Sequence, residues 1–311
     1  MSTDLVTARR ERVLDAMTAA GVDVLVLGRQ DNAGYVCGMR RLWTAGTRPF
    51  GAGCIVVGAT GRVHALSSWD DGIEPPMSFD DLYPLTWNPR IMAASMAAID
   101  GLAGAGRIGV DELTPSFDRA AAHFAPDADV VAADDLMAGV RRHKLPGEVE
   151  AIARACRAAW VGAEAALNAG ESADPVASAI EALAARGVTV PSSGIRAERR
   201  GDGLSVDIGV IRDLYEGGVG GVFVDGRRAG STALADACRD GATHADLAAA
   251  ATANDWLVRG LGMGFERPVI GPQVGLGERL EADMVLSVTD GNRRDVIHVT
   301  ASTPVVLSAR P

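Results

Sequence analysis

The sequence lacks the features that suit a nucleic-acid or membrane partner. Among its 311 residues, 40 Asp and Glu outnumber 30 Lys and Arg, which gives a formal net charge of −10. It has no stripe of Lys and Arg, although proteins that follow a phosphate backbone carry such a basic patch. No apolar run approaches the roughly 18 residues of a membrane span, and the N-terminus has no apolar signal core. We therefore expect a cytoplasmic protein that binds neither nucleic acid nor membrane.

Cysteine, aromatic residues and phosphate-loop motifs are also scarce. The four cysteines form no CxxC pair, and Cys54 and Cys156 lie in apolar runs. We therefore expect buried free thiols in a reducing compartment. The glycine clusters are not followed by the Gly-Lys-Ser/Thr of a phosphate loop. Aromatic residues make up only 5% of the chain, and the abundant alanine and glycine instead favour close packing of helices on sheets.

The first part of the chain alternates between strand-like and helix-like segments. Helices are predicted from apolar residues at helical spacing, and strands from short apolar runs bounded by glycine. The predicted helices are 5–20, 92–102 and 117–124, and the predicted strands are 22–27, two within 53–68, 107–110 and 128–131. This alternation is typical of an α/β domain.

The pattern changes after a basic stretch that ends at Pro146. This proline suits the first turn of a helix, where its missing N–H costs nothing, and Glu148 and Glu150 favour the positive end of the helix dipole. The predicted helices beyond this point are 146–169, 173–185 and 245–258, and the predicted strands are 204–210, 221–224, 284–288 and 296–299. Glycine-separated strands in antiparallel style, with segregated helices, indicate an α+β second domain.

Six phrases along the chain resemble the creatinase/prolidase/aminopeptidase P family, and they occur in the family's order. The segment Arg142-His-Lys-Leu-Pro-Gly-Glu-Val-Glu150 looks like the family's linker, and Ser205-Val-Asp-Ile-Gly209 looks like the strand with the first metal-binding Asp. The other four phrases are 31–38, 260–264 with Pro268, 284–288 with Gly291, and 299–308.

The resemblance implies a fold and a domain division. It implies an N-terminal α/β domain of ribonuclease-H-like shape at residues 1–141. An α+β pita-bread domain at residues 142–311 would follow, and the chain would form a homodimer. The second domain is shorter than the family's usual one, with sequence missing before Asp207 and between Phe223 and Ala245.

The family's peptidases hold two cations with four carboxylates and one histidine, and the cations activate a water. The resemblance places these five positions at Asp207, Gly218, Arg259, Thr289 and Arg294. Only Asp207 keeps a ligand of the expected kind, because glycine has no side chain and a guanidinium stays protonated and repels a cation. We therefore expect no metal and no other cofactor. Local slips of the alignment leave four substitutes open, namely Glu216, Asp290, Asp295 and His298.

Two interpretations of Arg259 and Arg294 stay open. Their charges either replace the cations and bind an anionic group such as a carboxylate, or pair with leftover acids as structural salt bridges. Asp207 is accordingly a candidate general base or the acid that neutralises an arginine. His298 is a candidate for proton transfer, because imidazole changes charge near neutral pH, or an ordinary strand residue.

Other side chains are candidates for contact with a substrate. Thr289, Tyr215 and Glu216 are predicted to face it, the last two from a hairpin tip beside a run of glycines at 217–221. Such glycines either let a backbone approach a ligand or simply form turns.

In family dimers, a loop of the N-terminal domain reaches the partner's active site. By this resemblance, Arg41, Trp43 and Trp69 are candidates for substrate or dimer contacts, with packing between the domains as the alternative.

Three functions remain open. The missing ligands and the shortened second domain favour a non-catalytic member, either a binding protein or a regulatory partner of an intact homologue. A second candidate is a metal-independent hydrolase or lyase of creatinase type, which acts on a C–N bond of a small guanidino or amino-carboxylate compound. The third is an Xaa-Pro-type metallopeptidase with an unusual ligand set. A small anionic or amino-carboxylate compound is the expected ligand.

Overall fold

The computed structural model divides into two compact units, Met1–Val140 and Arg141–Pro311. The sequence places the boundary one residue later, between residues 141 and 142. The structure describes residues 3–38, 53–66, 77–83, 88–111, 115–170, 173–188, 190, 194–230 and 232–311. No helix among them is both long enough and apolar enough to cross a membrane.

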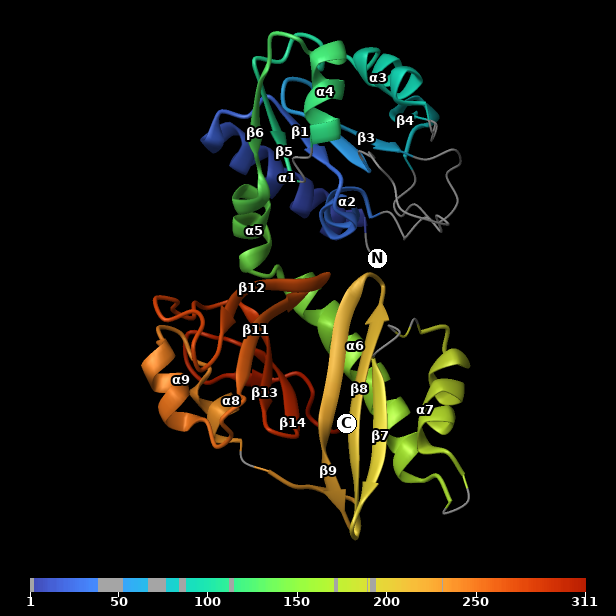
Figure 1. The fold of residues 1–311 in the computed structure, drawn as a ribbon, viewed down its shortest axis with the longest axis vertical. Coiled ribbons are helices and arrows are strands. Elements are labelled where there is room, and N and C mark those ends of the chain that lie inside the picture. The colour runs from blue at the N-terminus through green and yellow to red at the C-terminus, as the bar shows by residue number, and fades with distance from the viewer. Residues whose placement is uncertain are drawn as a thin grey trace. The chain divides into compact units, whose positions relative to one another are not determined.

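The first unit is a six-stranded mixed sheet with helices packed on it (Figure 1). The strand order is β4-β3-β2-β1-β5-β6, and the central β1 runs antiparallel to β2 and parallel to β5. Its elements are α1 (Thr3–Ala20), β1 (Val24–Leu27), α2 (Gln30–Cys37), β2 (Cys54–Val57), β3 (Arg62–Leu66), a 3-10 helix (Phe79–Asp81), β4 (Leu82–Tyr83), α3 (Pro89–Ala97), β5 (Arg107–Val110), α4 (Pro115–Phe124), β6 (Asp129–Ala132) and α5 (Asp134–Arg142). These positions confirm the α/β prediction for this part of the chain.

A buried carboxylate ties the strand ends of this unit together. Asp111 follows β5 directly and is 1% exposed. It accepts hydrogen bonds from the backbone N–H of Gly28 at 2.6 Å and from the side-chain amide of Asn32 at 2.8 Å. Because Gly28 follows β1 and Asn32 lies in α2, one side chain fixes the end of β1 against the next helix. All four cysteines of the chain are free and buried, as predicted.

The second unit is built on a nine-stranded sheet. The order is β12-β11-β13-β14-β9-β8-β7, with β10 paired to β9 and β15 to β14. All of these described pairings are antiparallel, which confirms the α+β prediction. Its elements are α6 (Pro146–Leu167), α7 (Pro175–Ala184), β7 (Ile195–Arg200), β8 (Gly203–Arg212), β9 (Tyr215–Val224), β10 (Arg227–Arg228), α8 (Ala233–Ala237), α9 (His244–Ala250), β11 (Leu257–Gly262), β12 (Gly264–Ile270), β13 (Val285–Asp290), β14 (Arg293–His298) and β15 (Val305–Val306).

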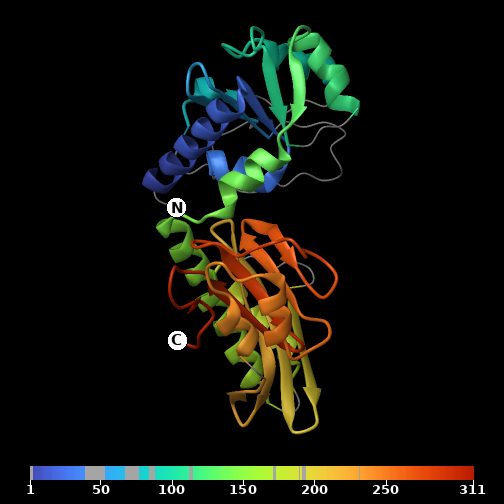
Figure 2. The same cartoon turned by 90° about the vertical axis from the view of Figure 1, so that its left-hand side faces the viewer.

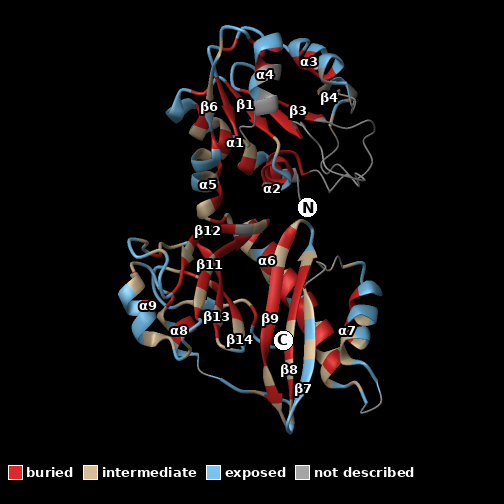
Figure 3. Ribbon diagram, viewed as in Figure 1, coloured by how far each residue is buried: buried red, intermediate tan, exposed pale blue. Residues whose placement is uncertain are grey.

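The two faces of this sheet differ in chemistry. Helices pack on this sheet (Figures 1 and 2), and buried residues occur along both its strands and its helices (Figure 3). Apolar residues form two clusters between the helices and the sheet, and the clusters share no residue. One cluster joins α6 and α7 to β7, β8 and β9, and the other joins α8 and α9 to β11, β13 and β14. Neighbouring residues of a strand point to opposite faces. The other face, called the charged face below, therefore carries Asp207, Glu216, Arg259, Thr289 and Arg294.

One predicted helix is too long. The segment 245–258 forms α9 only as far as Ala250, and β11 begins at Leu257. Asp290 explains the break, because its carboxylate accepts hydrogen bonds from the backbone N–H groups of Thr252 at 3.0 Å and Ala253 at 2.7 Å. This contact from β13 comes from a distant part of the sequence, and the local helical pattern does not contain it.

The glycine run at 217–221 lies inside β9 and forms no turn. These glycines are pressed from both faces of the sheet. A Cβ at Gly217 would lie 2.4 Å from the carbonyl carbon of Ala155 in α6, and one at Gly221 would lie 2.6 Å from Cγ of Arg228. The glycines are therefore needed for close packing inside a strand.

Candidate functional site

Strand pairing assembles the charged face around Arg294. In the β8–β9 hairpin Asp207 lies opposite Gly220, and Arg294 of β14 lies opposite the same glycine on its other side. Thr289 of β13 is directly opposite Arg294. Directly opposed residues point to the same face of a sheet. The register therefore brings Asp207, Thr289 and Arg294 to one side.

The remaining two positions from the family pattern lie on the same face. Gly218 is two residues from Gly220 along β9 and is paired with Gly209 of β8. Arg259 of β11 is opposite Ser287 of β13, two residues before Thr289. All five positions that the sequence resemblance selects are thus neighbours on the charged face.

Arg294 fills the space that a side chain at position 218 would take. A Cβ at Gly218 would lie 2.8 Å from Cζ of Arg294. The Nη2 of Arg294 is 2.6 Å from Oδ1 of Asp207, and the two side chains are 16% and 47% exposed. The guanidinium therefore lies on bare glycine backbone and is paired with the one ligand-type carboxylate of the set.

Arg259 forms a second ion pair, in a more enclosed position. Its Nη2 is 2.5 Å from Oε1 of Glu216, and the side chains are 15% and 17% exposed. Its Nη1 also donates a hydrogen bond to the Gly260 carbonyl at 3.3 Å. Both arginines therefore have the salt-bridge arrangement, one of the two interpretations that the sequence left open.

His298 lies on the charged face, four residues beyond Arg294 on β14. Its Nε2 is 3.6 Å from Oδ1 of Asp283, a side chain that is 65% exposed. The imidazole is therefore directed to Asp283, whereas Asp207 is engaged by Arg294. The predicted catalytic roles of Asp207 and His298 remain predictions.

Tyr215 is not on the charged face. It is fully buried, and its hydroxyl donates a 2.8 Å hydrogen bond to Oε1 of Glu148 in α6. The other carboxylate oxygen of Glu148 accepts from the Leu145 backbone N–H at 3.0 Å. Tyr215 thus holds β9 against the start of α6, which corrects its predicted role as a ligand contact. Alternation along β9 was the signal that separates it from Glu216.

The three candidates from the first unit, Arg41, Trp43 and Trp69, lie outside the described residues. Their predicted contacts with a substrate or a second protomer stay predictions.

Known proteins resemble this chain in both the sequence of its first unit and its overall structure. Residues 9–143 match the family model of the Creatinase/Prolidase N-terminal domain. The prolidase from Pyrococcus horikoshii OT3 has a similar structure, with a TM-score of 0.71 at 15% identity over 98% of this chain and 99% of that one. The Xaa-Pro dipeptidase from Bacillus anthracis matches with a TM-score of 0.70 at 17% identity over 98% of each chain. No curated protein matches the chain.

The chain has a creatinase/prolidase N-terminal domain and the overall fold of the prolidases. A dipeptidase from Mycobacterium ulcerans is similar too, with 20% identity, a TM-score of 0.63 and coverage of 100% of this chain and 97% of that one. At such identities the likeness shows the pita-bread fold and leaves the activity to be argued from the site.

The donor set of this prolidase fold does not fit two metal ions. A dinuclear site needs carboxylates that bridge two cations. Here the Arg294 guanidinium covers Gly218 and contacts the carboxylate of Asp207. Among the described residues, no group of three or more His, Cys, Asp or Glu side chains is arranged to hold a metal. The residues therefore disagree with the metal that the fold family implies.

The acids that the sequence left open as substitute ligands are engaged elsewhere. Glu216 is paired with Arg259, and Asp290 accepts backbone hydrogen bonds from Thr252 and Ala253. Asp295 points to the helix-covered face, where Nε of Arg293 is 2.7 Å from its Oδ2. These contacts leave none of the three as a ready replacement for a ligand on the charged face.

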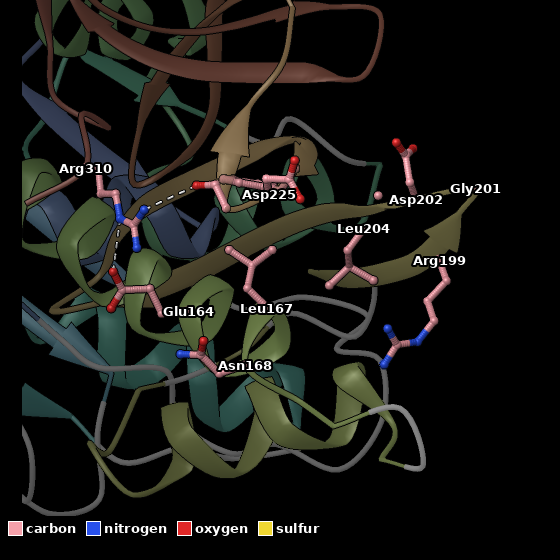
Figure 4. A pocket seen from close by; sticks show the side chains of 12 residues that line it. Glu164, Leu167, Asn168, Arg199, Gly201, Asp202, Leu204, Asp225 and Arg310 are labelled. Carbon is pink, nitrogen blue, oxygen red and sulfur yellow. Dashed lines mark hydrogen bonds and ion pairs between the residues drawn. The ribbon is translucent and has the colours of Figure 1, made fainter.

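A pocket of about 380 Å³ lies in another part of the second unit (Figure 4). It is formed by the end of α6, the β7–β8 hairpin and the turn after β9. Glu164 and Arg310 are 3.3 Å apart at one end of it, and Arg199 donates to the Gly170 carbonyl at 3.1 Å. None of the described candidate site residues lines this pocket.

Proposed function

We propose that this prolidase-like chain is not a dinuclear metallopeptidase and that it works as a non-catalytic binding or regulatory protein. One observation carries the proposal: the guanidinium of Arg294 takes the place of a side chain at position 218 and contacts Asp207 at 2.6 Å. A fixed positive charge at this point opposes the binding of a divalent cation. Arg259, paired with Glu216, places a second guanidinium where the sequence resemblance puts the family's histidine.

The first experiment tests the loss of the metal site. Purified protein is incubated with Mn²⁺, Co²⁺ or Zn²⁺ and dialysed, and bound metal and hydrolysis of Xaa-Pro dipeptides are then measured. We expect no stoichiometric metal and no hydrolysis. A variant with Gly218→Asp, Arg259→His, Thr289→Glu and Arg294→Glu restores the ligand types and is expected to retain metal. Stoichiometric metal in the wild type, together with hydrolysis, would overturn the proposal.

The second experiment tests the regulatory role. The tagged chain is expressed with a homologue from the same source that keeps all five ligands, and co-purification and the homologue's peptidase activity are measured. We expect the two to co-purify with a change in that activity. The wild-type chain is also incubated with small guanidino and amino-carboxylate compounds. Metal-free cleavage of a C–N bond would replace the proposal with the alternative of a creatinase-type hydrolase or lyase.

A further inference from the structure

The second unit consists of two halves, each with its own apolar core. The first half contains α6, α7 and β7–β10, and its buried cluster includes Trp160, Leu183 and Phe223. The second half contains α8, α9 and β11–β15, and its cluster includes Leu247 and Leu286. Because the clusters share no residue, apolar burial stabilises each half separately.

Within the sheet, the halves meet at a seam between β9 and β14, and outside the sheet Trp160 of α6 donates a hydrogen bond to the Ser308 carbonyl at 2.8 Å. Within these two fully described strands, a single residue pair joins them, Arg294 with Gly220. By contrast, the β8–β9 ladder runs from Leu204 to Arg212, and the β13–β14 ladder runs from Val285 to Asp290. The ladder that unites the sheet is therefore weakest at the centre of the candidate site.

Charged pairs cross this seam on both faces. On the charged face, Asp207 of β8 pairs with Arg294 of β14, and Glu216 of β9 pairs with Arg259 of β11. On the helix-covered face, Arg228 of β10 contacts Asp295 of β14. Arg228 is 12% and Asp295 3% exposed, so this pair and the Glu216–Arg259 pair are largely shielded from solvent screening. Each pair has one partner in each half.

We propose that these three ion pairs form a clasp that keeps the two halves of the pita-bread unit closed, and that the β9–β14 seam is a hinge. When the hinge opens, Asp207 and Glu216 separate from their arginines, and the charged face exposes two carboxylates and two guanidinium groups that otherwise neutralise each other. Opening of the seam therefore controls when the site is available to an ionic ligand. All three pairs lie within the second unit, and the clasp does not depend on the proposed function.

A separate charged cluster joins the second half to the segment just before α6 and does not depend on the three pairs. Glu266 of β12 lies 2.5 Å from Nζ of Lys144 and 2.7 Å from Nη2 of Arg141, in the segment that leads into α6. Burial raises the pKa of Glu266, but the two cations lower it by more, so the net shift is downward. This carboxylate therefore stays ionised and anchored, and variants in the clasp are expected to fold.

Hydrogen exchange measured by mass spectrometry tests the clasp. Glu216→Gln removes one charge of a cross-seam pair, and we expect exchange in peptides covering 218–222 and 293–297 to become about tenfold faster. Exchange rates in peptides from the interior of α6 are expected to change little. The double variant Glu216→Arg/Arg259→Glu reverses the pair and is expected to return the rates to near those of the wild type. The matched control is Glu198→Gln, because Glu198 and its partner Arg200 lie on the same strand, 3.0 Å apart.

The pattern of exchange decides the outcome. Faster exchange confined to the seam, reversed by the double variant, supports the clasp. An even rise across the whole second unit, or unchanged rates at the seam, overturns it. Arg259→Lys provides a milder second variant, with the same localisation and a smaller rise expected. Metal content is measured on the same samples, so failure of the clasp is distinguishable from failure of the proposed function.

Discussion

The guanidinium of Arg294 lies directly on the backbone of Gly218, where an added Cβ would approach Cζ to 2.8 Å. Gly220, the residue paired with Arg294 across the strands, also leaves room, since a Cβ there would lie 3.1 Å from Cβ of Arg294. The absence of a side chain at position 218 and the position of the Arg294 guanidinium therefore depend on each other. A side chain at position 218 requires the Arg294 guanidinium to move or to be replaced.

This relationship predicts strong coupling between the two positions. Gly218→Ala places a methyl group against the guanidinium and should cost about 1–3 kcal/mol in free energy of unfolding. In an Arg294→Ala background the same change should cost much less, because the clash is gone. Urea unfolding of the wild type, both single variants and the double variant measures the coupling. Gly277→Ala is the control, since a Cβ there meets nothing within 4 Å. If Gly218→Ala costs the same in both backgrounds, the guanidinium of Arg294 does not lie against Gly218.

The two ion pairs of the charged face should differ in strength. Glu216→Gln removes the carboxylate that pairs with Arg259 in a site where both side chains are 17% exposed or less, and we expect a loss of about 1.5–3 kcal/mol in free energy of unfolding. Asp207→Asn removes a carboxylate that is 47% exposed, so water screens the pair and a loss of about 1 kcal/mol is expected. Urea unfolding gives both values. A cost for Asp207→Asn that equals or exceeds that for Glu216→Gln would show that burial does not set the ranking.

Tyr215 should matter for stability and not for ligand binding. Tyr215→Phe removes the 2.8 Å hydrogen bond to Glu148, a residue that is 1% exposed. The substitution should lower the free energy of unfolding by about 1–3 kcal/mol. Any ligand found for the charged face should bind the variant with unchanged affinity, because Tyr215 points to the opposite face. Calorimetry on the folded variant checks the second part; a clear loss of affinity would restore the predicted contact.

Much of the charged face was predictable because a hairpin register fixes which residues share a face. The spacing from Asp207 to Gly218 and the pairing of Thr289 with Arg294 both depend on short connections between adjacent strands. Local sequence spacing therefore contains this information. The same alternation separates Tyr215 from Glu216, so the incorrect placement of Tyr215 at the ligand was avoidable.

Other features depend on contacts that no local pattern contains. The Glu216–Arg259 pair joins β9 to β11, although β13 and β14 lie between these strands in the sheet order. The glycines of β9 resemble a turn in sequence, yet they are required by α6 on one face and by Arg294 on the other. The early end of α9 is set by Asp290, which lies on a distant strand. Such tertiary contacts override local propensity.

Asp111 in the first unit should make the folded state less stable as the pH rises, whereas a salt-bridged carboxylate has the opposite effect. Burial raises the pKa of Asp111 from 3.8 to about 6, although hydrogen bonds from Asn32, Gly28 and Arg29 act to lower it. Between about pH 4 and pH 6 the folded state therefore retains a proton that the unfolded state has lost. The stabilisation is full below about pH 4 and disappears as the pH rises through about 6, with a maximum difference of about 3 kcal/mol.

The measurement is urea unfolding of the wild type and Asp111→Asn across this pH range. Because many groups titrate in both proteins, the informative quantity is the difference between their free energies of unfolding. We expect the wild type to lose stability relative to the variant as the pH rises, since only the wild type must then bury a charge beside β1 and β5. Asp127→Asn, at an exposed aspartate of the same unit, is the matched control for replacing an aspartate by asparagine. A wild type that gains stability relative to Asp111→Asn with rising pH would mean that the hydrogen bonds from Asn32 and Gly28 outweigh burial and that the carboxylate is held ionised.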